Sequence, residues 1–390
     1  MTDIMQRKEI DASNLMAALA VGSIALLVLG LQPILLGELL NARRVSLEGV
    51  GLVAMAEIVA VGLGVLAGDL AQPLSRLRSV AVLAALASGA IDICTLRIEG
   101  DVGFALIRAA AGLAEGLLVW VATAVIVRCA KPDRVAGIFF VVQTAAQALL
   151  GLLLARLVIP AFGWSGAFMV LAGLMAPVVV IALFLPGQLA ALVPPALSGF
   201  VWSARTALPL LAVFLQLATL GSLWAYVEPL GKDAGLPAQA VETLIAICLG
   251  VQVLGGSCGS ALVRKLRTPT TLLLGSGVLG VVALSVAGTA AGHTMEFAVL
   301  CGVFSFTWLF ITPFQMRLAF DADGSGRIAS LVPAAQVFGI AFGPLAASFV
   351  VEGEQARSVP LVSAAFAAGA MATLALGMAW HRRGHPQVDA

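Results

Sequence analysis

Charged residues are scarce in this sequence. Only 11% of its 390 residues are Asp, Glu, Lys or Arg, whereas soluble domains carry about 25%. Hydrophobic residues make up 61%, and the mean hydropathy is +1.05. A soluble core could not bury so much apolar sequence, so the solvent around most of the chain must be a lipid bilayer. The net charge of +1 gives no reason to expect binding to nucleic acid.

Histidine and paired cysteine are also scarce. The three histidines lie in a loop or in the C-terminal tail, and the five cysteines are scattered without a CxxC pair. Such a set forms neither a disulfide framework nor a metal site, and we interpret the cysteines as small apolar packing residues. No cluster of His or Asp suggests acid–base or metal chemistry, so we expect a protein that is not an enzyme and has no metal or cofactor.

Twelve hydrophobic segments are long enough to cross a membrane as helices, because each has the roughly 17–25 apolar residues that a crossing needs. The alternation expected for a membrane barrel is absent. The first segment is too long for a signal peptide and lacks a small-residue cleavage site. The segments are about 14–40, 48–69, 79–97, 102–129, 135–159, 166–186, 206–230, 238–263, 269–291, 294–320, 328–351 and 358–380.

The widest interruption between segments contains Pro194-Pro195 and has no charge before Arg205, and it divides the segments six plus six. We expect an all-α integral membrane protein built as two six-helix bundles. The expected divisions are a cytoplasmic N-terminus (1–13), an N-terminal bundle (14–186), a central linker (187–205), a C-terminal bundle (206–380) and a cytoplasmic tail (381–390).

Lysine and arginine set the expected orientation, because cytoplasmic loops carry an excess of both. With the N-terminus in the cytoplasm, 15 of the 22 basic residues fall inside, 6 fall outside, and Arg108 lies within a helix. We therefore expect both termini in the cytoplasm and a multi-pass protein of the cell (inner or plasma) membrane.

A degenerate repeat relates the two halves at an offset of 193 residues. Residues 104–107 match residues 297–300, and the matched single residues are Arg134 with Arg327 and Gln143 with Gln336. We expect two copies of one unit, with a site where they meet. The repeat fails at its charged positions, since the second copy has Cys301 in place of Arg108 and Trp308 in place of Glu115.

Charged side chains inside apolar segments are costly and usually face a protein interior or a wet cavity. Arg108 and Glu115 share one helix face about 10 Å apart along the axis, so we expect each to find its partner elsewhere. Arg108 either braces the bundle or attracts an anion, because it stays charged in any environment. Glu57 and Glu115 are candidates for proton coupling, or else structural hydrogen-bonding groups. We expect Asp92 to lie close to the outer surface.

The run from Arg108 through Gly112 to Gly116 resembles the fourth-helix signature of the major facilitator superfamily. Residues 64–78 are similar to the family's motif between its second and third helices, although the acid and bases are further apart and the usual Gly before the bases is missing. The resemblance covers about residues 14–380. It implies a secondary transporter, with two pseudo-symmetric bundles around a central site that opens alternately to each side.

The resemblance also implies that segments 3, 6, 9 and 12 lie away from the central pathway, and no intramembrane glutamine falls in them. A glutamine in hydrocarbon is costly without a partner, so a polar pathway and interhelical hydrogen bonding are both open roles. The candidate pathway residues are Gln32, Arg108, Gln143, Gln147, Gln216, Trp224, Tyr226, Gln252, Trp308, Gln315 and Gln336.

Short basic turns occupy equivalent places in the two halves, at 75–78 and 264–267. They are interpreted either as simple positive-inside anchors or as a cytoplasmic latch that binds the opposite bundle in one conformation. The latch candidates are Asp69, Arg76, Arg78, Arg134, Arg264 and Arg267.

The leading hypothesis is a secondary active transporter of a small organic solute, proton-coupled and working by alternating access; Arg108 favours an organic anion. Efflux of drugs or metabolites and flipping of lipids or lysolipids are alternatives, although segment 135–159 lacks the Gly-Pro pair of drug:proton antiporters. A membrane sensor without transport is a further alternative. The expected partners are a small-molecule substrate, protons and the lipid bilayer, and we expect a monomer.

Overall fold

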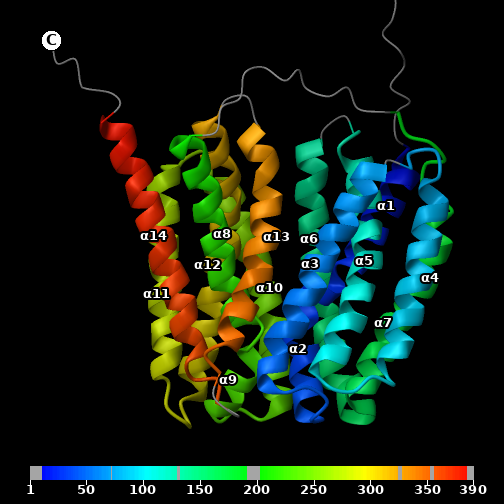
Figure 1. The fold of residues 1–390 in the computed structure, drawn as a ribbon, viewed down its shortest axis with the longest axis horizontal. Helices are drawn as coiled ribbons and strands as arrows, with labels where there is room; N and C mark the ends of the chain where they lie inside the picture. The colour runs from blue at the N-terminus through cyan, green and yellow to red at the C-terminus, as the bar shows by residue number, and fades with distance from the viewer. Residues whose placement is uncertain are drawn as a thin grey trace, which may run out of the picture.

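The structure, a computed structural model, describes residues 11–71, 73–129, 132–190, 203–323, 327–351 and 355–383. These residues form helices that stand side by side in two groups (Figure 1). The N-terminal bundle contains α1 (Ala12–Ala25), α2 (Leu27–Asn41), α3 (Leu47–Ala71), α4 (Leu77–Thr95), α5 (Asp101–Ile126), α6 (Pro132–Leu153), the π-helical turn η1 (Leu154–Val158) and α7 (Ile159–Ala182). The C-terminal bundle contains α8 (Ala204–Trp224), α9 (Val227–Asp233), α10 (Ala238–Leu262), α11 (Thr268–Gly288), α12 (Thr294–Ala322), α13 (Arg327–Ser348) and α14 (Val359–Arg383).

Eleven helical stretches among the described residues are long and apolar enough to cross a membrane. One of them, Val135–Ala182, runs for 48 residues through α6, η1 and α7. Gly163 interrupts it with φ 60° and ψ −159°, a backbone conformation that is essentially restricted to glycine. Divided at Gly163, this stretch supplies two crossings, so the twelve predicted crossings are all present and the predicted fold class is confirmed.

The helices also follow the repeat that the sequence predicts. Helices α5 and α12 begin at Asp101 and Thr294, and helices α4 and α11 end at Thr95 and Gly288. Both pairs of positions are 193 residues apart, which is the offset of the sequence repeat. The pseudo-symmetry of the two bundles is therefore visible in the helix boundaries as well as in the matched residues.

Successive crossings alternate in direction, so α1 begins and α14 ends at the same end of the molecule (Figure 1). We call this the termini end, and we call the opposite end, which carries α9, the α9 end. Helices α3 and α13 converge toward the α9 end, whereas α13 and α6 stand apart toward the termini end (Figure 1).

The two bundles pack tightly against each other at the α9 end. Gly51 of α3 lies against α13 and α9: a Cβ built on it would lie 2.8 Å from the Cβ of Ser348 and 2.7 Å from the hydroxyl of Tyr226, and closer still to the carbonyl of Pro344. Only a residue without a side chain allows this approach. This end is therefore held closed by backbone contact between the bundles.

The buried apolar residues form two clusters, which differ in whether they extend over both bundles. One buried cluster extends over both bundles and includes Leu39 of α2, Val50 of α3 and Leu230 of α9. A second cluster, which includes Leu77 and Val121, belongs to the N-terminal bundle alone and contains the early residues of α1 and α4. Apolar burial therefore joins the bundles toward the α9 end, while the termini end of the N-terminal bundle has a core of its own.

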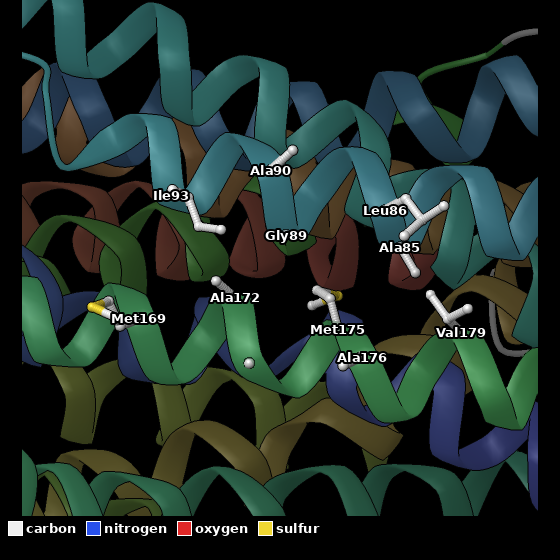
Figure 2. A pocket seen from close by; sticks show the side chains of 11 residues that line it. Ala85, Leu86, Gly89, Ala90, Ile93, Met169, Ala172, Met175, Ala176 and Val179 are labelled. Atoms are coloured by element: carbon white, nitrogen blue, oxygen red, sulfur yellow. The ribbon is translucent and has the colours of Figure 1, made fainter.

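A groove of about 470 Å³ lies between α4 and α7 on the N-terminal bundle (Figure 2). Small and apolar side chains line it, among them Leu86, Ile93 and Met169, which are exposed. Apolar side chains on the periphery of a membrane bundle face lipid. We therefore assign this groove to contact with the bilayer.

Candidate functional site

Four charged side chains meet inside the N-terminal bundle, and we call them the charged cluster: Glu57 of α3, Asp92 of α4, and Arg108 and Glu115 of α5. Each side chain is at most 3% exposed. Arg108 Nη1 donates to Asp92 Oδ1 at 2.6 Å, and its Nε donates to Glu57 Oε1 at 2.7 Å. Its Nη2 also contacts Glu57 and lies 3.4 Å from Glu115 Oε1. Arg108 thus connects three helices.

Two further residues complete the surroundings of the charged cluster. Gln32 of α2 donates from Nε2 to Glu57 Oε2 at 3.1 Å. The ring of Phe168 in α7 lies 5.3 Å from the guanidinium carbon of Arg108, within the range of a cation–π contact. By contrast, the buried Glu115 Oε2 has no hydrogen-bond partner.

The charges of the cluster do not balance. Three carboxyls surround one guanidinium, so full ionisation would leave two negative charges in excess in a buried place. An uncompensated charge in such surroundings is costly, and a carboxyl there takes up a proton instead. The cluster therefore has the chemistry to bind and release protons.

Glycines on α3 and α5 bring the charged cluster together. A Cβ on Gly112 would lie 2.5 Å from the carbonyl oxygen of Glu57. One turn further, a Cβ on Gly116 would lie 2.8 Å from the Cα of Gly64. Gly112 and Gly116, two small residues one turn apart, thus let the two backbones touch, as in other close membrane helix pairs. The Arg108 side chain consequently reaches Glu57 directly.

One expectation about these charges is wrong, and another holds only for Arg108. Asp92 is 1% exposed and pairs with Arg108, because α4 turns this carboxylate toward α5 and away from the outer surface. Arg108 finds its closest partners on other helices as expected, but Glu115 contacts Arg108 on the same helix, because the long side chains span most of the two-turn separation. The position of Asp92 as a single acid in an apolar segment was the sequence signal that could have predicted its burial.

Three predicted pathway glutamines form a hydrogen-bonded chain inside the C-terminal bundle. Gln336 Nε2 donates to Gln315 Oε1 at 2.8 Å, and Gln315 Nε2 donates to Gln216 Oε1 at 2.9 Å. Gln216 Nε2 in turn donates to Ser276 Oγ at 2.8 Å. The chain links α13, α12, α8 and α11. The buried Gln216 and Gln315 thus make interhelical hydrogen bonds, whereas Gln336 is half-buried.

The glutamines of α6 and α10 are also buried. Gln147 Nε2 donates at 2.7 Å to the carbonyl of Leu26, where α1 ends and α2 begins, and Gly30 makes room for this side chain. Gln143, one turn earlier, has a buried Oε1 without a hydrogen-bond partner. Gln252 of α10 is buried as well. Among these three, Gln143 has an acceptor left over for a solute.

The predicted aromatic residues lie in two places. Trp224 and Tyr226, at the junction of α8 and α9, are buried in the apolar cluster that joins the bundles. Their place in this structure is the closed α9 end. Trp308, in the middle of α12, is half-buried, and its Nε1 is a buried donor without a partner.

The predicted latch lies at the termini end and makes no ionic contact across the bundles among the described residues. Arg78 Nε donates to the carbonyl of Leu185 in its own bundle at 2.7 Å. Arg128, which was not among the predicted latch residues, interacts with Asp69 and donates to two carbonyls of its own bundle. The side chain of Arg134 lies outside the described residues. The exposed members are Asp69, Arg76, Arg78, Arg264 and Arg267.

Sequence reasoning missed a second polar group, at the α9 end. It consists of Glu38 and Asn41 on α2 and Glu228 and Lys232 on α9, and we call it the interbundle network. The acids of this network lie at the ends of the predicted segments, where charged residues are common and do not by themselves indicate a site. An acid at a segment end in each bundle was the only signal in the sequence.

Comparisons with known proteins agree with this architecture. One similar solved structure is a bacterial homologue of the human lysosomal transporter Spinster, inward-facing and unoccupied, with a TM-score of 0.73 and 13% identity over 99% of this chain and 100% of that chain. Another is the nucleoside transporter NupG, with a TM-score of 0.72 and 14% identity over 93% of this chain and 100% of that chain.

No curated protein matches the sequence at a significant level. The family model described as Major Facilitator Superfamily matches residues 13–344, which is most of the chain. Together with the twelve crossings in two related bundles, this match establishes the family. The chain belongs to the Major Facilitator Superfamily, and it is a multi-pass membrane transporter.

Proposed function

We propose that this protein is a secondary transporter that couples the movement of a small organic solute to protons, with the charged cluster as the proton site. The observation that carries the proposal is the excess of three buried carboxyls over one guanidinium. In this proposal Glu57 and Glu115 are the proton-coupling residues, as the sequence predicted, and Asp92 is added to them. Gaining or losing a proton changes how strongly Arg108 holds α3 and α4 to α5.

This structure corresponds in the proposed cycle to a state closed at the α9 end. The transition would separate α3 from α13 at Gly51 and bring the bundles together at the termini end, as alternating access requires. In that second state the exposed basic turns at the termini end, with Arg76 and Arg264, act as the latch of the proposed cycle. With the termini in the cytoplasm, the present state is inward-facing.

The solute in this proposal is neutral and polar. An organic anion was favoured because Arg108 stays charged in any environment, but three carboxyls surround it. Two candidate pathway residues away from the closed end have an uncharged buried polar atom without a partner, namely the Gln143 carbonyl oxygen and the Trp308 indole N–H. Both groups suit a polar ring compound, and a nucleoside transporter shares the fold. Nucleosides are therefore the first solutes to test.

The test is uptake of radiolabelled uridine and adenosine into proteoliposomes under an imposed pH gradient. We expect wild-type uptake to depend on the gradient and Glu57→Gln to lose that dependence. The matched control is Glu99→Gln, which makes the same carboxyl-to-amide change at a side chain that is 82% exposed. Wild-type uptake that is equal with and without the gradient would refute the coupling.

A further inference from the structure

The groove between α4 and α7 is an open apolar channel on the periphery of the N-terminal bundle. It runs along both helices, from Ala85 and Val179 at one end to Ile93 and Met169 at the other (Figure 2). Because α4 begins at the termini end, the end of the groove with Ala85 and Val179 faces that way. Gly173 of α7 keeps the groove open, since a Cβ built on it would meet nothing within 4 Å.

Arg78 lies at the termini end of this groove. It precedes Ala85 by seven residues and Gly89 by eleven on α4, close to two and three helical turns, so the three share one helix face. Ala85 and Gly89 line the groove. Arg78 Nε donates at 2.7 Å to the carbonyl of Leu185, just beyond the end of α7. Arg78 therefore connects the same two segments that form the walls of the groove.

The guanidinium of Arg78 has donors to spare. Its side chain is exposed, and neither Nη1 nor Nη2 forms a hydrogen bond or ion pair with a residue that the structure describes. The start of α4 also lacks an acceptor, because its N-cap, Arg76, makes no side-chain capping hydrogen bond. The N–H groups and the positive dipole of a helix start attract anions. Two arginines and a helix start thus present donors for an anion at the end of an apolar groove.

The distance from Arg78 to the far end of the groove matches the length of a phospholipid. Arg78 and Ile93 are 15 residues apart on α4, or about 22 Å along the helix axis. The polar interface of a bilayer is about 5–7 Å thick on each side, and the hydrocarbon of one leaflet is about 15 Å thick. An acyl chain whose phosphate lies at Arg78 would therefore follow the groove and end near Ile93.

We propose that this groove binds one anionic phospholipid of the leaflet at the termini end, with the phosphate on Arg78 and the start of α4 and an acyl chain between α4 and α7. A planar guanidinium binds phosphate through two parallel N–H donors, and both Nη groups of Arg78 are free for this contact. Arg76 adds a second positive charge, so a headgroup with net negative charge is favoured over a zwitterionic one. The site shares no residue with the charged cluster and does not depend on proton coupling.

The second copy of the repeat provides an internal comparison. At the offset of 193 residues, the position of Arg78 corresponds to Thr271 of α11. Thr271 has a neutral side chain, whose hydroxyl donates to the carbonyl of Arg267 on its own helix at 3.0 Å. Helices α11 and α14 therefore offer a lipid-facing surface without the arginine anchor, against which binding at α4 and α7 can be compared.

The test is photolabelling with a phosphatidylglycerol that carries a diazirine in its acyl chain, added to phosphatidylcholine vesicles that contain the protein. Irradiation attaches the probe to whatever lies beside the chain, and mass spectrometry locates the labelled peptides. We expect labelling of α4 and α7 to exceed labelling of α11 and α14. The same diazirine chain on phosphatidylcholine should label the groove less. Equal labelling of all four helices by the phosphatidylglycerol probe, or equal labelling of the groove by the two lipids, would overturn the proposal.

Gly173→Leu tests the acyl-chain part of the site. The new side chain fills the groove without a clash inside the protein, because the Cβ meets nothing within 4 Å, and it should abolish the excess labelling of α4 and α7. Gly377→Leu is the matched control, since a Cβ on this glycine of α14 also meets nothing within 4 Å, and it should leave the excess unchanged. Excess labelling that survives Gly173→Leu would overturn the placement of the chain.

Arg78→Gln tests the headgroup part. Glutamine can still donate to the Leu185 carbonyl, but the positive charge is lost. The preference for phosphatidylglycerol over phosphatidylcholine should fall about fivefold, the effect of one basic residue near an anionic headgroup. Arg267→Gln, at an exposed arginine that precedes α11, is the control and should keep the preference. A preference that survives Arg78→Gln would overturn the role of this arginine.

Two further arms identify the ligand and keep this proposal separate from transport. Glycerol 3-phosphate has the phosphate without an acyl chain and should not displace the probe at millimolar concentration. Displacement would assign the site to a soluble anion and overturn the lipid. Glu57→Gln should leave the labelling intact even though it removes the gradient dependence of uptake. Failure of the transport proposal and failure of this one are therefore observed separately.

Discussion

Gly51→Ala should weaken closure of the α9 end specifically. The added Cβ would lie 2.8 Å from the Cβ of Ser348 and 2.7 Å from the hydroxyl of Tyr226. Carbon atoms in contact normally lie about 3.5–4.0 Å apart, so α3 and α13 must separate by about 1 Å. Overpacking of this kind costs about 1–3 kcal/mol. That energy corresponds to a loss of roughly 5- to 150-fold in the ratio of closed to open molecules.

Spin labels on cysteines at Glu99 and Glu296, exposed positions of the two bundles at the α9 end, report the result by pulsed electron resonance once the five native cysteines are replaced. Gly51→Ala should move the distribution of label distances toward larger values than in the wild-type protein. Gly250→Ala is the matched control, because a Cβ on this glycine of α10 meets nothing within 4 Å. An unchanged distribution in Gly51→Ala, or an equal shift in the control, would refute the assignment of this contact as the closed gate.

Three further predictions concern stability, measured as the midpoint of thermal unfolding in detergent. Asp92→Asn removes the carboxylate that accepts a hydrogen bond from Arg108 Nη1, while Glu57 still compensates the guanidinium, and it should cost about 1.5–3 kcal/mol; an unchanged midpoint would contradict the pairing. Gly116→Ala overpacks α3 against α5 and should cost about 1–3 kcal/mol. The control Gly302→Ala should be close to neutral, because a Cβ at this position meets nothing within 4 Å. Equal effects of the two substitutions would contradict the close contact between α3 and α5. Gln315→Leu leaves Gln216 Oε1 and Gln336 Nε2 without the partner that Gln315 supplies, and it should cost about 1–3 kcal/mol. A neutral effect would mean that the glutamine chain is dispensable.

The fold could be predicted because the bilayer fixes the length of each crossing. An apolar helix must span a constant thickness, so its ends follow from hydropathy alone. Helix α12, for example, runs from Thr294 to Ala322 where the sequence indicated 294–320. The merging of α6, η1 and α7 was not predicted, because helical hydrogen bonding continues up to Gly163 without a polar loop.

The candidate site could be predicted only in part. Arg108 and Glu115 were found because a charge within an apolar segment is costly and is kept mainly where it pairs or functions. Asp92 was misplaced because the family resemblance assigned its segment to the periphery, and the turn of α4 toward α5 is a tertiary property. The pairing of Asn41 with Glu228 depends on the approach of two bundles far apart in the sequence, which no local pattern encodes.

The most direct test of proton coupling is to measure whether protons move when the solute moves. Proteoliposomes loaded with the pH indicator pyranine receive an outward or inward gradient of radiolabelled uridine or adenosine, with no pH gradient imposed. We predict that solute flux through the wild-type protein changes the internal pH, and that Glu57→Gln carries the solute without that change. Solute flux through the wild-type protein with no change in internal pH would contradict proton coupling.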